Sequence, residues 1–180
     1  QDKTIDSLLT MLNAAKRDTN KVKLFNDLAS KYISINNTVK ATSYADSSEL
    51  LATALYYKTG KANAIVLKGQ AESKKGNREN AVGKYKLAAN LYHELGDKTA
   101  EANTFTSIAG EYAQKDNYVE ALRYRHAAMK LYEELNIKDG LMRTFLGIGS
   151  VYGNLANYPE AMKYFFTVLK MAKEAGNKNI

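Results

Sequence analysis

The feature that most constrains the fold of this chain is an internal repeat with a period of 40 residues. Four segments of that length align without a gap, and they are residues 19–58, 59–98, 99–138 and 139–178. One aligned column is apolar and consists of Phe25, Ile65, Phe105 and Phe145. Another consists of Asn37, Asn77, Asn117 and Asn157. A fixed period of this kind predicts stacked copies of one supersecondary unit, in which each copy buries its apolar face on its neighbours.

Within each segment, the apolar residues follow the spacing of a helix. In residues 99–138 the first set is spaced i, i+3, i+4 and i+7, and it consists of Phe105, Ile108, Ala109 and Tyr112. The second half of that segment repeats the spacing in Ala121, Tyr124, Ala128 and Leu131. Turns such as KDN and KGN separate the halves, and Asn or Gly tolerates left-handed dihedrals there. Each segment therefore predicts a helical hairpin, and Pro159, the only proline, suits the first turn of a second helix.

Three glycines crowd the stretch LGIGSVYGNLANYPEAM, and they are Gly147, Gly149 and Gly153. Such a cluster serves either a phosphate-binding loop or the close approach of two helices. The spacing here is G-x-G-x-x-x-G, whereas the dinucleotide signature needs G-x-G-x-x-G between a strand and a helix. The column of Gly149 holds small residues in the other segments, namely Ala29, Gly69 and Ala109. The sequence therefore favours helix packing at this column.

Residues 1–18 are interpreted as half a repeat that forms a capping helix. Its apolar face consists of Ile5, Leu8, Leu9 and Leu12. We expect this helix to pack on residues 19–35. With two further helices for each segment, the sequence predicts an all-α fold of about nine helices, arranged as one solenoid domain.

Composition and motifs argue against catalysis and against several classes of ligand. The net charge is +7 and the pI is near 9.3, but the lysines are scattered along the chain, so nucleic-acid binding is not predicted. There is no cysteine, and the two histidines, His93 and His126, occupy different repeat columns, which disfavours a metal site. The sequence contains no hydrolase, metalloprotease or P-loop motif. We therefore expect no enzyme activity, no metal and no cofactor. Because no apolar run of about 18 residues occurs, we also expect no membrane contact by this segment.

The residues of this pattern resemble the tetratricopeptide repeat family over residues 19–178. The stretches FTSIAGEYAQKDNYVEALRY and FLGIGSVYGNLANYPEAMKYF carry the resemblance, and the 40-residue period is similar to that of Pins-type and kinesin-light-chain-type repeats. The resemblance implies a right-handed superhelical solenoid of stacked hairpins. Some residues depart from the family pattern, and they are Lys68 and Glu72 in the second segment and Thr38, Ala45 and Glu49 in the first.

The resemblance also implies that ligands lie against the first helices, on the concave face of the solenoid. One column there consists of Lys23, Asn63, Asn103 and Arg143. Neighbouring columns add Asn26, Ser30, Gln70, Thr106, Ser150 and Asn154. Asn side chains both donate and accept hydrogen bonds, so a row of them suits the backbone of an extended peptide, while Lys23 and Arg143 favour acidic groups. We therefore predict a non-catalytic scaffold that binds a protein or peptide here; the alternative is that these are ordinary surface residues.

A second interpretation is a sensor or connector region of a larger bacterial signalling protein, either a histidine kinase or a transcription regulator, that acts through packing or dimerisation. The stretch QDKTIDSLLTMLNAAKRDTNKVKLFNDLASKY resembles extracytoplasmic repeat regions of Bacteroidetes sensor histidine kinases and related regulators. That resemblance implies a periplasmic or extracytoplasmic location, with a cytoplasmic one as the alternative. At the other end, no capping helix follows Phe145, Leu169 and Met171. We therefore expect either more chain after Ile180 or self-association through this edge.

Overall fold

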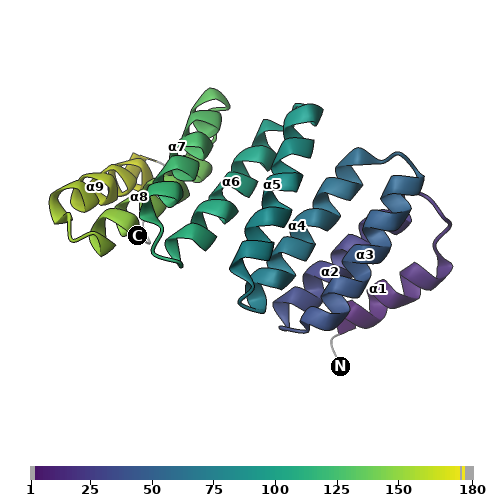
Figure 1. Cartoon of the computed structure of the whole chain (residues 1–180). Coiled ribbons are helices and arrows are strands. Elements are labelled where there is room, and N and C mark those ends of the chain that lie inside the picture. Colours follow the sequence, from purple (N-terminus) through teal and green to yellow (C-terminus); the bar gives the residue numbers. More distant parts are fainter. Residues whose placement is uncertain (1–2, 175, 177–180) are drawn as a thin grey trace. The chain divides into compact units, whose positions relative to one another are not determined.

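The structure, a computed structural model, describes residues 3–174 and Gly176. This part of the chain contains nine α-helices and no strand (Figure 1). Their bounds are α1 Lys3–Ala14, α2 Thr19–Ser34, α3 Thr38–Ala54, α4 Lys58–Lys74, α5 Arg78–Leu95, α6 Lys98–Ala113, α7 Tyr118–Glu134, α8 Lys138–Asn154 and α9 Tyr158–Glu174. The predicted all-α fold of repeated helical hairpins is confirmed.

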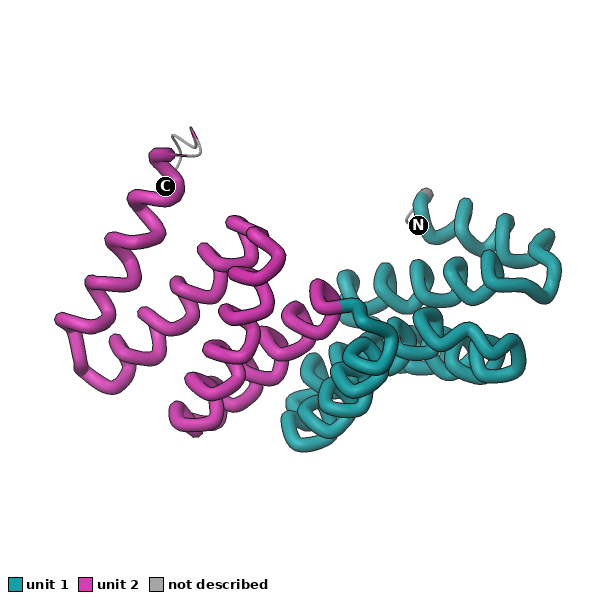
Figure 2. The backbone as a smooth tube through the Cα atoms, turned by 90° about the horizontal axis from the view of Figure 1, so that it is seen from above, with its two compact units in different colours: residues 1–97 teal, residues 98–180 magenta. Residues whose placement is uncertain are grey.

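The helices fall into two compact units, Gln1–Asp97 and Lys98–Ile180 (Figure 2). In the first unit α2 pairs with α3 and α4 pairs with α5, and α3 also packs against α4. In the second unit α6 pairs with α7 and α8 pairs with α9, and α7 packs against α8. Each pair joins the two helices that one sequence segment predicts. The grouping of all four segments into a single domain stays a prediction.

Helix α1 packs against α2 at the start of the first unit. Ile5 and Leu12 are buried in one cluster with Leu28 of α2. The half-buried Leu8 and Leu9 pack against the same cluster. The residues that the sequence assigns to one apolar face of α1 therefore share the core of the first hairpin, which shields that core from water.

A residue in the left-handed region follows each helix from α2 to α9. These residues recur every 20 positions, and they are Asn36, Tyr56, Gly76, Gly96, Asp116, Asn136, Ala156 and Gly176. In the KGN turn Gly76 takes this conformation, as predicted, but in the KDN turn Asp116 takes it, so the prediction that an Asn provides it is wrong there. Asn117 instead caps α7, because its Oδ1 accepts from a backbone N–H of that helix at 3.2 Å. Asn37 and Asn157 accept in the same way, so the asparagine column serves mainly as helix caps.

The glycine cluster lies within α8 rather than in a loop. A methyl group at Gly149 would come within 2.6 Å of the ring of Phe165 on α9. A methyl group at Gly69 on α4 would come equally close to the ring of Tyr85 on α5. Glycine at this column therefore makes room for an aromatic ring of the second helix, as expected for helix packing.

Aromatic triplets recur in three of the four segments. Each joins a Phe and a Tyr of the first helix to a Tyr of the second helix, and they are Phe25, Tyr32 and Tyr44; Phe105, Tyr112 and Tyr124; and Phe145, Tyr152 and Tyr164. The two Tyr rings of each triplet stack with centroids 5.5, 5.8 and 5.9 Å apart. In the second segment the same columns hold Ile65, Glu72 and Lys84. One segment therefore lacks the ring stack that the other three share.

Helix α9 leaves part of its apolar surface exposed. The residues expected to be uncovered, Phe145, Leu169 and Met171, are half-buried. Greater exposure occurs at three neighbouring side chains, with exposed fractions of 53% for Met162, 41% for Phe165 and 59% for Phe166. Exposed apolar patches often mark contacts, and self-association through this face stays a prediction.

Candidate functional site

A groove of about 240 Å³ lies between the first helices of the unit Gln1–Asp97. Helices α2 and α4 contact each other there, and α5 contributes one side chain. The lining residues are Asn26, Asp27, Ser30, Asn63, Val66, Leu67 and Tyr92. Three residues that the sequence predicts to face a ligand, Asn26, Ser30 and Asn63, therefore meet in one groove.

Asn26 contributes to the wall of this groove but is only 8% exposed. Its Nδ2 donates to the carbonyl of Gly60 on α4 at 3.4 Å. Its Oδ1 is buried and has no hydrogen-bond partner in the described part of the chain. A buried acceptor without a partner destabilises a fold by roughly 1–3 kcal/mol. Asn26 is therefore mainly a contact between α2 and α4, and it is less accessible than the sequence predicts.

Asn63 is exposed, and Tyr92 of α5 fixes the orientation of its amide. The hydroxyl of Tyr92 donates to Oδ1 of Asn63 at 2.6 Å. Burial, followed by the charge of Asp97, raises the pKa of Tyr92 to about 12, so the hydroxyl keeps its proton at neutral pH. Because Oδ1 is occupied, the NH₂ group of Asn63 remains available, and a peptide carbonyl is a suitable acceptor for it.

The unit Lys98–Ile180 contains the same pair 40 positions later. The hydroxyl of Tyr132, whose side chain is buried, donates to Oδ1 of the exposed Asn103 at 2.7 Å. In the first and fourth segments the column of Asn63 and Asn103 holds Lys23 and Arg143. The column of Tyr92 and Tyr132 holds Ala52 and Ala172 in those segments. Asparagine thus occurs where a tyrosine reaches it from the second helix, and a cation occurs where the second helix carries alanine.

The other predicted site residues differ in accessibility. Three are exposed, and they are Lys23, Arg143 and Asn154. Gln70 and Thr106 are half-buried. The hydroxyls of Thr106 and Ser150 donate to carbonyls of their own helices at 3.1 and 2.9 Å. Because Asn63 and Asn103 belong to different units, one continuous row along the whole chain stays a prediction.

Four residues of the groove were not predicted from the sequence, and they are Asp27, Val66, Leu67 and Tyr92. For Tyr92 a signal was present. Tyrosine occupies its column only in the segments that carry Asn63 or Asn103, so the two columns vary together. The contact between them required the packing of α5 against α4.

The groove presents two amides, two hydroxyls and one carboxylate, which suit hydrogen bonding to a polar ligand. In the part of the chain that the structure describes, no three Asp, Glu or His side chains gather closely enough to hold a metal ion. Within the same residues, no helix combines the length and hydropathy needed to cross a bilayer.

The sequence matches no family model and no curated protein, whereas solved structures do match it. Aspartyl phosphate phosphatase F from Bacillus subtilis superposes with a TM-score of 0.87 at 18% identity, over 94% of this chain and 44% of that chain. A signal transduction ATPase with a tetratricopeptide repeat sensor, from Pyrococcus horikoshii, gives a TM-score of 0.84 at 17% identity, over 94% of this chain and 27% of that chain. The fold is of the tetratricopeptide repeat (TPR) type.

A third TPR-like match is the Rap conjugation gene regulator of the plasmid pLS20 in complex with the Phr* peptide. Its TM-score is 0.76 at 13% identity, over 89% of this chain and 44% of that chain. The chain thus spans less than half the length of each of these three proteins. At such identities the likeness shows the fold, and the TPR-type fold that the sequence predicts is confirmed.

Proposed function

We propose that this chain is a non-catalytic scaffold that binds an extended peptide segment on the face of its first helices. The observation that carries the proposal is the tyrosine–asparagine pair found once in each unit. Tyr92 and Tyr132 each occupy the acceptor of an asparagine and leave its two N–H donors unused. A buried hydroxyl that orients an exposed amide in this way prepares the amide for a backbone carbonyl.

The strength of such binding follows from the groups involved. Each asparagine contributes roughly 1 kcal/mol net, and Arg143 contributes about twice that if it meets a carboxylate. These contacts add up to roughly 4 kcal/mol, and the half-buried Val66 of the groove adds some apolar contact, so we expect affinity no tighter than micromolar. The exposed Arg143 should also make binding weaker as the salt concentration rises.

A structural neighbour supports a peptide as the class of partner. The Rap conjugation gene regulator of pLS20, whose fold this chain shares over 89% of its length, was solved in complex with the Phr* peptide. We therefore propose a peptide as the class of ligand for the present chain, and not that particular peptide.

The test begins with a display library of random linear peptides, from which binders to the full chain are selected. The best peptide is then titrated against Asn63→Asp and Asn103→Asp, since aspartate keeps the acceptor for tyrosine but has no N–H donors. We expect a loss of about fivefold or more in each variant, which corresponds to about 1 kcal/mol. Asn90→Asp is the control, because it adds the same charge at an exposed position on α5 outside the groove. Unchanged affinity in both test variants would exclude this face as the binding surface.

The sensor or connector interpretation remains the second proposal. The Pyrococcus horikoshii ATPase includes a tetratricopeptide repeat sensor, and the present chain spans 27% of that protein. This supports a role for the chain as one region of a larger signalling protein. An extracytoplasmic location is proposed on the sequence resemblance alone.

A further inference from the structure

The second segment, residues 59–98, breaks the repeat at three columns that are apolar or aromatic elsewhere. Lys68 occupies the column of Leu28, Ile108 and Ile148, which are fully buried. Glu72 occupies the column of Tyr32, Tyr112 and Tyr152, and Lys84 occupies the column of Tyr44, Tyr124 and Tyr164. Sequences break local rules of this kind mainly at functional or strained sites.

Glu72 and Lys84 do not replace the missing ring stack by pairing with each other. Glu72 instead accepts hydrogen bonds from Lys75 and Asn77, both at 2.8 Å. A cavity of about 510 Å³, open to solvent on the side of the exposed Leu87, lies between α3, α4 and α5, and both Glu72 and Lys84 line it. This volume falls within the range of about 300–1,000 Å³ that is usual for small-molecule sites.

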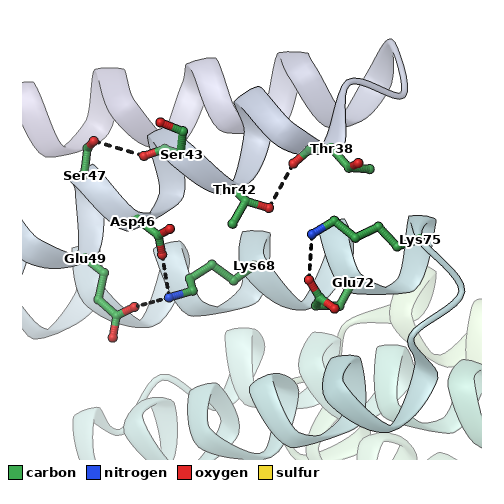
Figure 3. Close-up of polar contacts among 9 residues, drawn as sticks. All are labelled: Thr38, Thr42, Ser43, Asp46, Ser47, Glu49, Lys68, Glu72 and Lys75. Carbon is green, nitrogen blue, oxygen red and sulfur yellow. Dashed lines mark hydrogen bonds and ion pairs between the residues drawn. The ribbon is translucent and has the colours of Figure 1, made fainter.

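Lys68 also lines the cavity, and its charge is neutralised from α3 (Figure 3). Its Nζ lies 2.6 Å from Oδ1 of Asp46 and 3.0 Å from Oε2 of Glu49. Burial lowers the pKa of Lys68, but the hydrogen bonds to the two carboxylates outweigh it and hold the pKa above its usual value. Lys68 is therefore held by two carboxylates of α3, and Glu72 is held by Lys75 and Asn77, so neither side chain is free to pair with a ligand of opposite charge.

Lys84 differs from both of these residues. Its side chain is half-buried in the cavity lining, and among the described residues it makes no hydrogen bond or ion pair. A partly desolvated ammonium without a partner destabilises the protein, and an anion that enters the cavity removes that cost. Glu72 and Glu79 place two carboxylates in the same lining, which disfavours ligands with more than one negative charge.

We propose that this cavity binds a small organic carboxylate with one negative charge and a body about the size of an aromatic ring. The carboxylate pairs with Lys84, and the ring occupies space next to Leu87 and Gly83, where the missing tyrosine leaves room. The cavity shares no lining residue with the groove at Asn63, so this site is independent of the proposed peptide-binding face.

In the experiment, the full chain is titrated with three matched probes at constant ionic strength, and each titration is monitored by proton–nitrogen correlation spectra. Benzoate carries both the ring and the charge, benzamide carries the ring alone, and acetate carries the charge alone. We expect saturable shifts of α4 and α5 amides with benzoate at least about tenfold tighter than with either other probe. Equal affinity for benzamide would overturn the role of charge, and equal affinity for acetate would overturn the ring-sized body. Absence of saturation with benzoate would overturn the site.

Three variants assign the binding to the proposed residues. Lys84→Met should weaken benzoate binding at least about tenfold, whereas Lys74→Met removes an equal charge from an exposed position outside the cavity and should leave it unchanged. The double variant Glu72→Tyr, Lys84→Tyr restores the ring pair of the other segments, and it should abolish binding while raising the melting temperature. Benzoate binding that survives Lys84→Met or the double variant contradicts the proposal.

A carboxylate can come from a free small molecule or from an acidic side chain of a peptide. N-acetylglutamate N-methylamide distinguishes these sources, because it carries the carboxylate on a peptide backbone without a ring. Weaker binding than benzoate supports a free aromatic carboxylate. Tighter binding would contradict the ring-sized body and assign the cavity to an acidic peptide side chain.

Discussion

The hydroxyl of Tyr132 donates to Oδ1 of Asn103 at 2.7 Å, and the hydroxyl of Tyr92 donates to Oδ1 of Asn63 at 2.6 Å. The two pairs lie in different units and are related by the 40-residue period. In both, a buried tyrosine of the second helix holds an exposed amide of the first helix. This relationship links the packing of a hairpin to the proposed binding surface.

Removal of one of these hydroxyls should have a modest effect on stability. Tyr132→Phe loses one hydrogen bond but keeps the ring, and the freed Asn103 can turn to water because it is exposed. We expect the free energy of unfolding to fall by about 0.5–1.5 kcal/mol, measured by urea denaturation. Affinity for the selected peptide should fall severalfold, because the amide is no longer held in place. No change in either quantity would show that the pair is incidental.

Gly140, the small residue opposite Tyr132, should be required for the stability of the fold. A methyl group at Gly140 of α8 would come within 2.6 Å of the Tyr132 ring, which is 1% exposed and has no room to move. Gly140→Ala should therefore destabilise the protein by roughly 1–3 kcal/mol.

Gly153 in the same helix provides the matched control for this substitution. Nothing lies within 4 Å of a methyl group at Gly153, so Gly153→Ala should stabilise the protein by roughly 0.5–1 kcal/mol through helix propensity. Both values come from thermal or urea unfolding. If the two substitutions changed the free energy of unfolding in the same direction, the packing described at Gly140 would be contradicted.

Tyr92 should titrate well above an ordinary tyrosine. Burial, followed by the charge of Asp97, raises its pKa to about 12, compared with about 10 in the unfolded chain. Between these values the folded protein keeps a proton that the unfolded chain releases. Stability from this group is therefore fully present below about pH 10 and is lost as the pH rises towards 12, by about 1.4 kcal/mol per pH unit.

The measurement is the difference in phenolate absorbance between the wild type and Tyr92→Phe as the pH is raised. The missing transition should be centred near 12, and the pH dependence of stability between 10 and 12 should be shallower in the variant. If the transition that Tyr92→Phe removes is instead centred near pH 10, the hydroxyl is not buried against Asn63.

The exposed apolar face of α9 should support self-association. Phe166 is 59% exposed beside the partly exposed Phe165 and Met162. We expect sedimentation of the wild type to show a concentration-dependent dimer and Phe166→Glu to be monomeric with unchanged helicity, because the substitution adds a charge at an exposed position. A wild type that stays monomeric at all concentrations would exclude this contact.

Helix order and hairpin pairing could be predicted from the sequence because both depend on local spacing and on the repeat itself. The apolar columns place Ile108 and Ile148 in the core, and both are fully buried. The asparagine caps were harder to predict, because Asn117 and Asp116 are neighbours with similar turn preferences and only the backbone decides which one is left-handed.

The details of the candidate site depend on tertiary contacts that no local pattern records. Asn26 is buried because α2 approaches the backbone of α4 closely at Gly60, where no side chain intervenes. The amide of Asn63 is oriented by a tyrosine 29 positions later in the chain, across a helix pair. The cavity at Lys84 arises from three departures that are separate in sequence and meet only after the hairpin forms.

The most direct test of the account observes the side-chain NH₂ groups of Asn63 and Asn103 while the selected peptide is added. Their resonances are assigned by their disappearance in Asn63→Asp and Asn103→Asp. We expect both pairs of amide signals to shift saturably, with the same midpoint as the binding curve. Peptide binding that shifts other resonances and leaves both amides unmoved would contradict it.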